Sequence, residues 1–130
     1  MEIVLEFVVK DVIKASEFYK KYLGFKVDYT EFTPIQWVQL SKDNTRIMLV
    51  NYDFTKKDIN GFKKYSKSTN IYKFMYEDLD EIKKIYDKLK KDNKDIFLDF
   101  RKAYLRYEFG VYDEDNNMIL ITKETLEDLK

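Results

Sequence analysis

Two stretches of the chain share one pattern, and this internal repeat limits the possible folds more than any other feature. Phe7 recurs as Phe74 and Asp11 as Asp78, an offset of 67 residues. Each stretch begins as an apolar strand and changes to a helical pattern at its aspartate. A unit that occurs twice predicts two similar modules rather than one continuous fold.

An aspartate begins each predicted helix. A carboxylate at this position accepts hydrogen bonds from the free N–H groups of the first helical turn. Apolar residues then recur with helical spacing, at positions 12, 15, 18, 19, 22 and 23 and at positions 79, 82, 85, 86 and 89. Gly24 follows the last apolar residue of the first helix, where a glycine suits the helix end.

Three β-like segments follow each helix, so each module has the order βαβββ and the fold class is α+β. The predicted strands cover 25–32, 35–41 and 46–52 in the first module and 95–99, 104–112 and 118–123 in the second. Module one spans 1–52 and module two 71–123. The polar segment 53–70 is predicted to be a linker with one helical turn, and the tail 124–130 a short polar helix or a frayed end.

The composition excludes several kinds of chemistry. The chain has no histidine and no cysteine, which rules out a thiol nucleophile, a histidine base and a Cys/His zinc site. Its 24 basic and 24 acidic residues give a formal net charge of zero, so we expect no general affinity for nucleic acid or membranes. The N-terminus is acidic and no apolar run is long enough to span a bilayer, so we expect a cytoplasmic protein.

Both ends of the repeat resemble a known family. The opening, from Phe7 to Phe25, is similar to the pattern V-x-D … S-x-x-F-Y … L-G-F. The segment 104–117 (YLRYEFGVYDEDNN) is similar to W-G-x-x-E-F-x-V-x-D-P-D-G-N, and its departures are Tyr104, Leu105, Glu114 and Asn116. Both patterns occur in the vicinal oxygen chelate superfamily, which includes glyoxalase I, extradiol dioxygenases, fosfomycin-resistance enzymes and bleomycin-resistance proteins.

The resemblance covers nearly the whole chain and carries expectations about fold and metal. It implies a single domain over 1–130, in which the tandem modules form a curved mixed sheet around a cup-shaped cavity. It also places the metal ligands of the superfamily at four positions, which here are Val4, Met48, Ile71 and Leu120. None offers an oxygen or nitrogen donor, so we expect no metal, no cofactor and no metal-dependent glyoxalase or dioxygenase activity.

Two charged residues are predicted to line the cup. Glu6 follows Val4 by two residues along its strand, and Lys73 follows Ile71 in the same way, so each pair shares a face. Glu6 and Lys73 also occupy equivalent positions in the repeat. A buried charge must be compensated. The two residues therefore form either a mutual ion pair or polar handles for a ligand.

Aromatic side chains are the other candidates, because the chain holds 11 Tyr, 10 Phe and one Trp. Aromatic walls with a few polar groups are typical of ligand pockets. The candidates on the later strands or their ends are Trp37, Phe32, Tyr52 and Tyr104. Trp37 is the best candidate for stacking on a ligand. Glu108 could receive a cationic ligand, or face solvent.

Three functions are compatible with these residues. The first, similar to metal-free bleomycin-resistance-like proteins, is a homodimer that sequesters a small aromatic molecule or antibiotic, cationic ones included, with no catalytic residue. The second is a metal-independent enzyme of the lyase or isomerase type that uses Glu6, Glu108 or a tyrosine as acid or base. The third is a regulatory or structural dimer.

Overall fold

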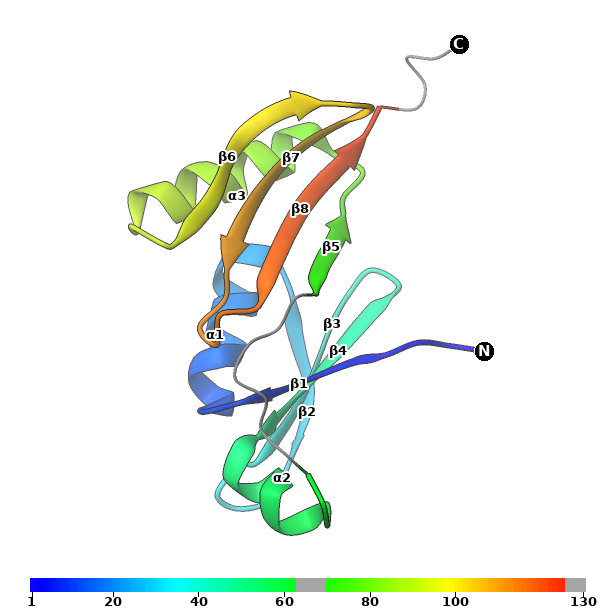
Figure 1. The fold of residues 1–130 in the computed structure, drawn as a ribbon, viewed down its shortest axis with the longest axis vertical. Coiled ribbons are helices and arrows are strands. Elements are labelled where there is room, and N and C mark those ends of the chain that lie inside the picture. Colours follow the sequence, from blue (N-terminus) through cyan, green and yellow to red (C-terminus); the bar gives the residue numbers. More distant parts are fainter. Residues whose placement is uncertain (63–69, 126–130) are drawn as a thin grey trace. The chain divides into compact units, whose positions relative to one another are not determined.

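The two repeated stretches of the sequence fold into the same order of one strand, one helix and three strands (Figure 1). The computed structural model describes residues 1–62 and 70–125 and divides into two units, Met1–Lys67 and Ser68–Lys130. The first unit consists of β1 (Leu5–Val9), α1 (Val12–Leu23), β2 (Lys26–Glu31), β3 (Trp37–Lys42), β4 (Thr45–Asn51) and α2 (Tyr52–Asp58). The second consists of β5 (Ile71–Met75), α3 (Leu79–Lys91), β6 (Ile96–Ala103), β7 (Arg106–Tyr112) and β8 (Met118–Glu124). The predicted α+β class and the tandem βαβββ order are confirmed.

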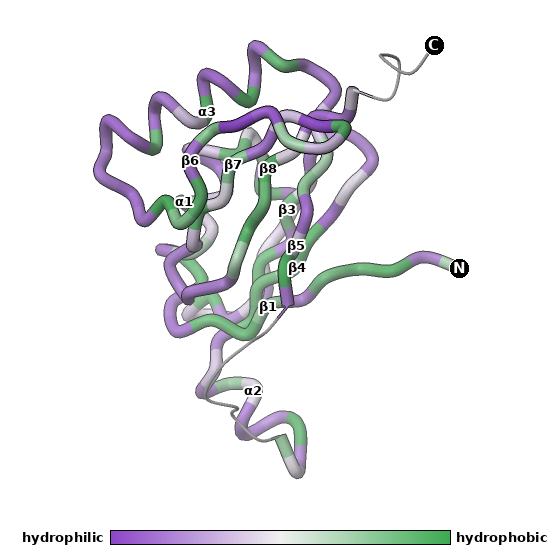
Figure 2. Tube along the Cα trace, turned by 45° about the horizontal axis from the view of Figure 1, so that its top comes forward, coloured by the Kyte–Doolittle hydropathy of each residue, from purple (hydrophilic) through white to green (hydrophobic). Residues whose placement is uncertain are grey.

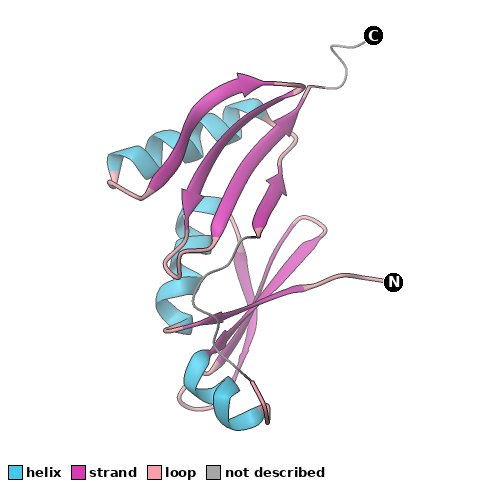
Figure 3. Cartoon of the chain, viewed as in Figure 1, coloured by secondary structure: helices cyan, strands magenta, loops and turns pink. Residues whose placement is uncertain are grey.

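Each unit contains its own four-stranded sheet (Figure 3). The strand orders are β1-β4-β3-β2 and β5-β8-β7-β6. The first strand of each unit pairs with the last in parallel, and the remaining neighbours are antiparallel. The mixed character of the predicted sheet is therefore confirmed, with the strands divided into one sheet per unit.

The predicted aspartate caps begin both main helices. Asp11 Oδ1 accepts hydrogen bonds from the backbone N–H groups of Ile13 at 3.0 Å and Lys14 at 3.1 Å. Asp78 Oδ1 accepts one from Asp80 at 2.9 Å. Gly24 ends α1 with φ 81°, a left-handed conformation that glycine adopts without strain.

One face of each sheet packs against the helix of the same unit. In the first unit this face includes Val38, Leu40, Ile47 and Leu49, all buried, and the ring of Phe7 lies 6.2 Å from that of Tyr19 on α1. In the second unit it includes Phe109, Val111, Ile119 and Ile121, which are fully buried together with Ile82 and Leu89 of α3. Figure 2 shows a β8 that is hydrophobic along most of its length and an α3 that is mostly hydrophilic. Burial of these side chains drives the folding of each unit.

The linker is more ordered than the sequence indicates. Residues 52–58 form α2, about two turns of helix, where one turn was expected. Asn51 caps it, because its side chain accepts a hydrogen bond from the Phe54 N–H at 3.1 Å. The rest of the predicted linker, 63–69, and the predicted tail from 126 onward lie outside the described residues. In the part of the chain that is described, no helix is long and apolar enough to cross a membrane.

Gly110 occupies a position in β7 that has no room for a side chain. A Cβ built on it would overlap the ring of Phe97 on the neighbouring strand. The Phe97 ring also lies 4.9 Å from that of Tyr112, which restricts where it can move. Glycine in a strand often marks such a close approach.

We expect Asp11→Ala to lower the free energy of unfolding by about 0.5–2 kcal/mol, because two N–H groups lose their acceptor. Asp78→Ala should cost less, since it removes one such bond. Urea denaturation followed by circular dichroism measures both. Asp11→Asn is the control, because asparagine keeps the acceptor, and an equal loss in that variant would contradict the capping role.

We expect Gly110→Ala to destabilise the protein by about 1–3 kcal/mol through overpacking against Phe97. The same substitution should cost clearly less in a Phe97→Leu background, where the ring is absent. A double-mutant cycle by urea denaturation measures this coupling. A cost that is the same in both backgrounds would show that the ring is not the cause.

Candidate functional site

The predicted site residues lie mainly on the sheet faces turned away from the helices. Side chains alternate between the two faces of a strand, so the neighbours of the helix-packed residues point the other way. We call this second face the distal face. The distal face of the first unit carries Glu6 and Trp37, and that of the second carries Lys73 and Glu108.

An exposed pair of aromatic rings lies on the distal face of the first unit. Trp37 and Tyr29 have ring centroids 5.3 Å apart and planes inclined at 46°. Tyr29 is 51% exposed, and Trp37 is half-buried. One acid lies beside them, because Glu31 pairs directly with Trp37 across β2 and β3. Glu6 lies on the same face but farther away, on β1, with Met48 and Gln39 between it and Tyr29. The face therefore offers ring surface next to negative charge.

A polar network fills the middle of the same face. Asp28 accepts hydrogen bonds from Gln39 Nε2 at 3.0 Å and from Ser41 Oγ at 2.8 Å. Those two bonds, the one from Gln39 first, hold the pKa of Asp28 below its ordinary value. Arg46 donates to Gln39 Oε1 at 3.4 Å and to Glu2 Oε1 at 2.7 Å. The network fixes the orientation of the buried Gln39 amide between Tyr29 and Met48.

The other two aromatic candidates lie at the same end of this sheet as Trp37. Phe32 follows β2 with φ 74°, and its ring centroid is 4.7 Å from that of Phe54 on α2. Tyr52 begins α2, and its ring lies 5.9 Å from that of Phe62. Both rings therefore have aromatic partners within the first unit, while Phe32 keeps 52% of its surface exposed.

A cluster of one acid and two arginines lies on the distal face of the second unit, and we call it the arginine cluster. Glu108 Oε2 accepts hydrogen bonds from Arg101 Nε at 2.9 Å and Nη2 at 2.7 Å, and Glu108 Oε1 accepts one from Arg106 Nε at 2.8 Å. The Glu108 side chain is only 2% exposed. Glu108 therefore does not face solvent, because the pairing with two guanidinium groups compensates its burial.

The Glu108 carboxyl stays ionised in spite of its burial. Burial by itself raises the pKa of Glu108, but the hydrogen bonds from Arg101 and Arg106, with their positive charges, outweigh it and lower that pKa overall. Sequence reasoning missed both arginines. Arg106 lies two residues before Glu108 on the same strand, so strand alternation alone predicts that the two side chains share a face. Arg101 pairs with Glu108 only through the register of β6 and β7.

The remaining predicted residues lie at the margins of the second unit's distal face. Tyr104 occupies the turn between β6 and β7 with φ 59°, is 78% exposed, and has its ring 5.4 Å from Arg106 Cζ. Lys73 is exposed on β5, opposite Leu120. The ion pair predicted between Lys73 and Glu6 would join residues of different units, and it stays a prediction.

The residues at the four positions where the resemblance places metal ligands do not fit a metal. Met48 lies opposite Glu6 in the first unit, and Leu120 lies opposite Lys73 in the second. Val4 precedes β1 and Ile71 begins β5. Three of these side chains are hydrocarbon and the fourth is a thioether, which is a poor donor for a hard divalent cation. Within residues 1–62 and 70–125, no three acidic residues gather as a metal site would require.

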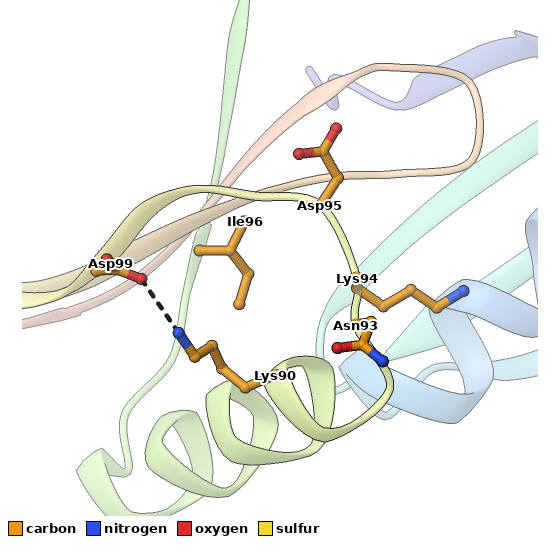
Figure 4. Close-up of a pocket in the computed structure, with 6 residues that line it drawn as sticks. All are labelled: Lys90, Asn93, Lys94, Asp95, Ile96 and Asp99. Carbon is orange, nitrogen blue, oxygen red and sulfur yellow. Dashed lines mark ion pairs between the residues drawn. The ribbon is translucent and has the colours of Figure 1, made fainter.

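A shallow polar hollow of about 530 Å³ lies beside the C-terminal end of α3 (Figure 4). Its lining residues are Lys90, Asn93, Lys94, Asp95, Ile96 and Asp99. Lys90 Nζ approaches Asp99 Oδ1 at 3.7 Å, and Asp99 also accepts a hydrogen bond from Tyr86. None of the predicted ligand residues lines the hollow, so it gives no support to a site there.

Solved structures with low sequence identity share this fold. A glyoxalase/bleomycin resistance protein/dioxygenase family enzyme from Burkholderia phytofirmans superposes with a TM-score of 0.78 at 15% identity, covering 93% of this chain and 96% of its own. A hypothetical protein from S. aureus gives 0.76 at 16%, covering 94% and 92%. Lactoylglutathione lyase from Agrobacterium tumefaciens gives 0.73 at 14%, covering 97% and 95%.

The sequence itself places the chain in a family. No curated protein matches it. The family model of the glyoxalase/bleomycin resistance protein/dioxygenase superfamily, however, matches residues 3–121, which include every strand of both units up to the middle of β8. With the fold in agreement, the chain belongs to the glyoxalase/bleomycin resistance protein/dioxygenase superfamily.

Proposed function

We propose that this protein binds and sequesters a small aromatic compound, preferably a cationic one, on the distal face of its first unit and without a metal. The observation that carries this proposal is the exposed ring pair of Trp37 and Tyr29. The two rings are inclined at 46°, so a flat ligand could stack on one ring and meet the other at an angle. Phe32 adds a further half-exposed ring at the same end of the sheet, packed against Phe54.

The preference for a cation rests on the acids of the same face. Glu31 lies directly across from Trp37, and Glu6 lies farther off on the same face, on β1, which β4 separates from β3. A cation over an aromatic face is attracted by the ring, and a nearby carboxylate adds to that attraction. In the second unit Glu108 is already paired with two arginines, so the acidic role in this proposal belongs to Glu6 and Glu31.

The test uses three compounds of nearly the same shape: the cation benzamidine, neutral benzamide and the anion benzoate. The chain has a single tryptophan, so the indole N–H of Trp37 gives one resolved signal in a proton–nitrogen NMR spectrum. We expect benzamidine to shift this signal more strongly than benzamide. Trp37→Ala should weaken binding about tenfold, or ~1.4 kcal/mol, through loss of stacking and of the cation–ring attraction.

Ile13→Ala is the matched control, because it removes an exposed apolar side chain from the same unit, on α1. Its affinity for benzamidine should equal that of the unaltered protein. If none of the three compounds shifts the Trp37 signal at millimolar concentration, the proposal is wrong. Chemical conversion of a bound compound that Glu6→Gln abolishes would instead indicate the metal-independent enzyme of lyase or isomerase type.

We also propose that the protein acts as a homodimer. The edge strand β2 has all six of its residues exposed, and an unpaired strand edge is a common surface for pairing with a second copy. Analytical ultracentrifugation should give twice the chain mass of 15.9 kDa. A monomer mass across the micromolar range would contradict this expectation.

A further inference from the structure

The arginine cluster carries more positive charge than its own acid can neutralise. Arg101 and Arg106 each bring one positive charge, whereas the buried Glu108 brings a single negative one. The carboxylate is at the bottom of the cluster and the guanidinium groups are at its surface, since the Arg101 side chain is 46% exposed and that of Arg106 is 30% exposed. Glu124 lies directly across from Arg106 on β8. Among the described residues no hydrogen bond or ion pair joins these two side chains, so the exposed nitrogens of the cluster keep their positive charge.

The two guanidinium groups also keep N–H donors that no described residue uses. Arg106 donates to Glu108 only through Nε, which leaves both terminal nitrogens. Arg101 donates through Nε and Nη2, which leaves Nη1. Within the ranges 1–62 and 70–125 no group accepts a hydrogen bond from these terminal nitrogens. Because guanidinium N–H groups bind carboxylates in a planar, two-point geometry, the free donors suit an oxyanion.

The row of residues that crosses the sheet through Glu108 supplies further contacts. Register places Met75, Thr122, Glu108 and Arg101 side by side on β5, β8, β7 and β6. Thr122 Oγ1 is buried and has no hydrogen-bond partner among the described residues. Met75 is about half exposed at the end of the row. A ligand here would meet the apolar side chain of Met75 as well as the arginines, while the Thr122 hydroxyl lies buried beneath them.

We propose that Arg101 and Arg106 form a binding site for a small organic carboxylate on the distal face of the second unit. This site goes beyond the aromatic site proposed for the first unit and does not depend on it. Glu108 is a positioning residue, because its two oxygens hold both guanidinium groups in place before a ligand arrives. Such preorganisation reduces the entropy lost on binding.

An organic acid fits better than inorganic phosphate for two reasons. The cluster has a surplus of one positive charge, which matches one carboxylate, whereas phosphate carries more than one negative charge near neutral pH. The surroundings are also partly apolar: Leu105, beside Arg106 in the chain, is 40% exposed, and the Tyr104 ring lies against the Arg106 guanidinium. These groups can contact the hydrocarbon part of an acid.

The same benzamidine, benzamide and benzoate series tests this site through a different signal. The chain has only three arginines, Arg46, Arg101 and Arg106, so their Nε–H resonances are easily separated. We expect benzoate to shift the signals of Arg101 and Arg106 in a saturable way, and benzamide and benzamidine to leave them unchanged. Arg46, which is paired with Glu2 in the first unit, serves as the internal control and should not shift.

Variants then assign the binding to the cluster. Arg106→Gln should weaken benzoate binding about tenfold, and Arg106→Lys should fall between this variant and the unaltered protein, because lysine keeps the charge but not the planar pair of donors. Arg46→Gln should bind benzoate normally. If Arg106→Gln does not fold, two other measurements still test whether the cluster binds benzoate. These are the signal shifts in the unaltered protein and the benzoate affinity of Arg106→Lys.

Three results would overturn the proposal. Benzoate and benzamide could shift the Arg101 and Arg106 signals equally, which would exclude recognition of the charge. Inorganic phosphate could bind at least as tightly as benzoate, which would exclude the preference for an organic acid. Benzoate could also shift neither signal at millimolar concentration, which would leave the cluster a purely structural ion pair. Failure at these signals and failure at Trp37 are independent, because the signals belong to different sites.

Discussion

The alternation of strand side chains between two faces is the constraint on which the rest of the structure depends. Each unit has one main helix, α1 or α3, and that helix covers only one face of its four-stranded sheet. At the centre of the covered face the side chains are apolar and buried, as at Leu49 and Ile121. The distal face carries rings, charges and amides instead. The fold therefore confines any ligand chemistry of the strands to the distal faces.

Local features could be predicted from the sequence and longer-range pairings could not. The caps Asp11 and Asp78 bind N–H groups no more than three residues away. Asp113 likewise accepts hydrogen bonds from the N–H groups of Asp115 and Asn117 in the turn before β8. Neighbouring residues in the sequence were therefore enough to predict these features. The partners of Glu108 were missed because the register of β6 shifts twice, between Ile96 and Leu98 and between Leu98 and Arg101. Counting residues along such a strand does not reveal which side chain faces which.

The same limit explains the mixed outcome for the candidate site. Alternation along a strand was enough to place Glu6 on the face of Val4 and Lys73 on that of Ile71, and the repeat made the two charges equivalent. That Trp37 shares the face of Glu6 follows only from the register of β1, β4 and β3. The charge of each face depended on pairing across strands. Glu31 lies beside the ring pair of the first unit, while Arg101 and Arg106 reverse the sign of the region around Glu108. Two modules related by a repeat thus present chemically different faces.

The parallel pairing of first and last strands has a consequence for the order in which the chain folds. β1 can pair only with β4, and β5 only with β8, so the earliest strand of each unit has no neighbour until the latest one exists. The antiparallel hairpins β2–β3–β4 and β6–β7–β8 join segments close in sequence and form first, because short loops close at lower entropic cost. During synthesis the first sheet can therefore be completed only once Asn51, the last residue of β4, has emerged. In the same way β5 has no partner until β8 has been synthesised.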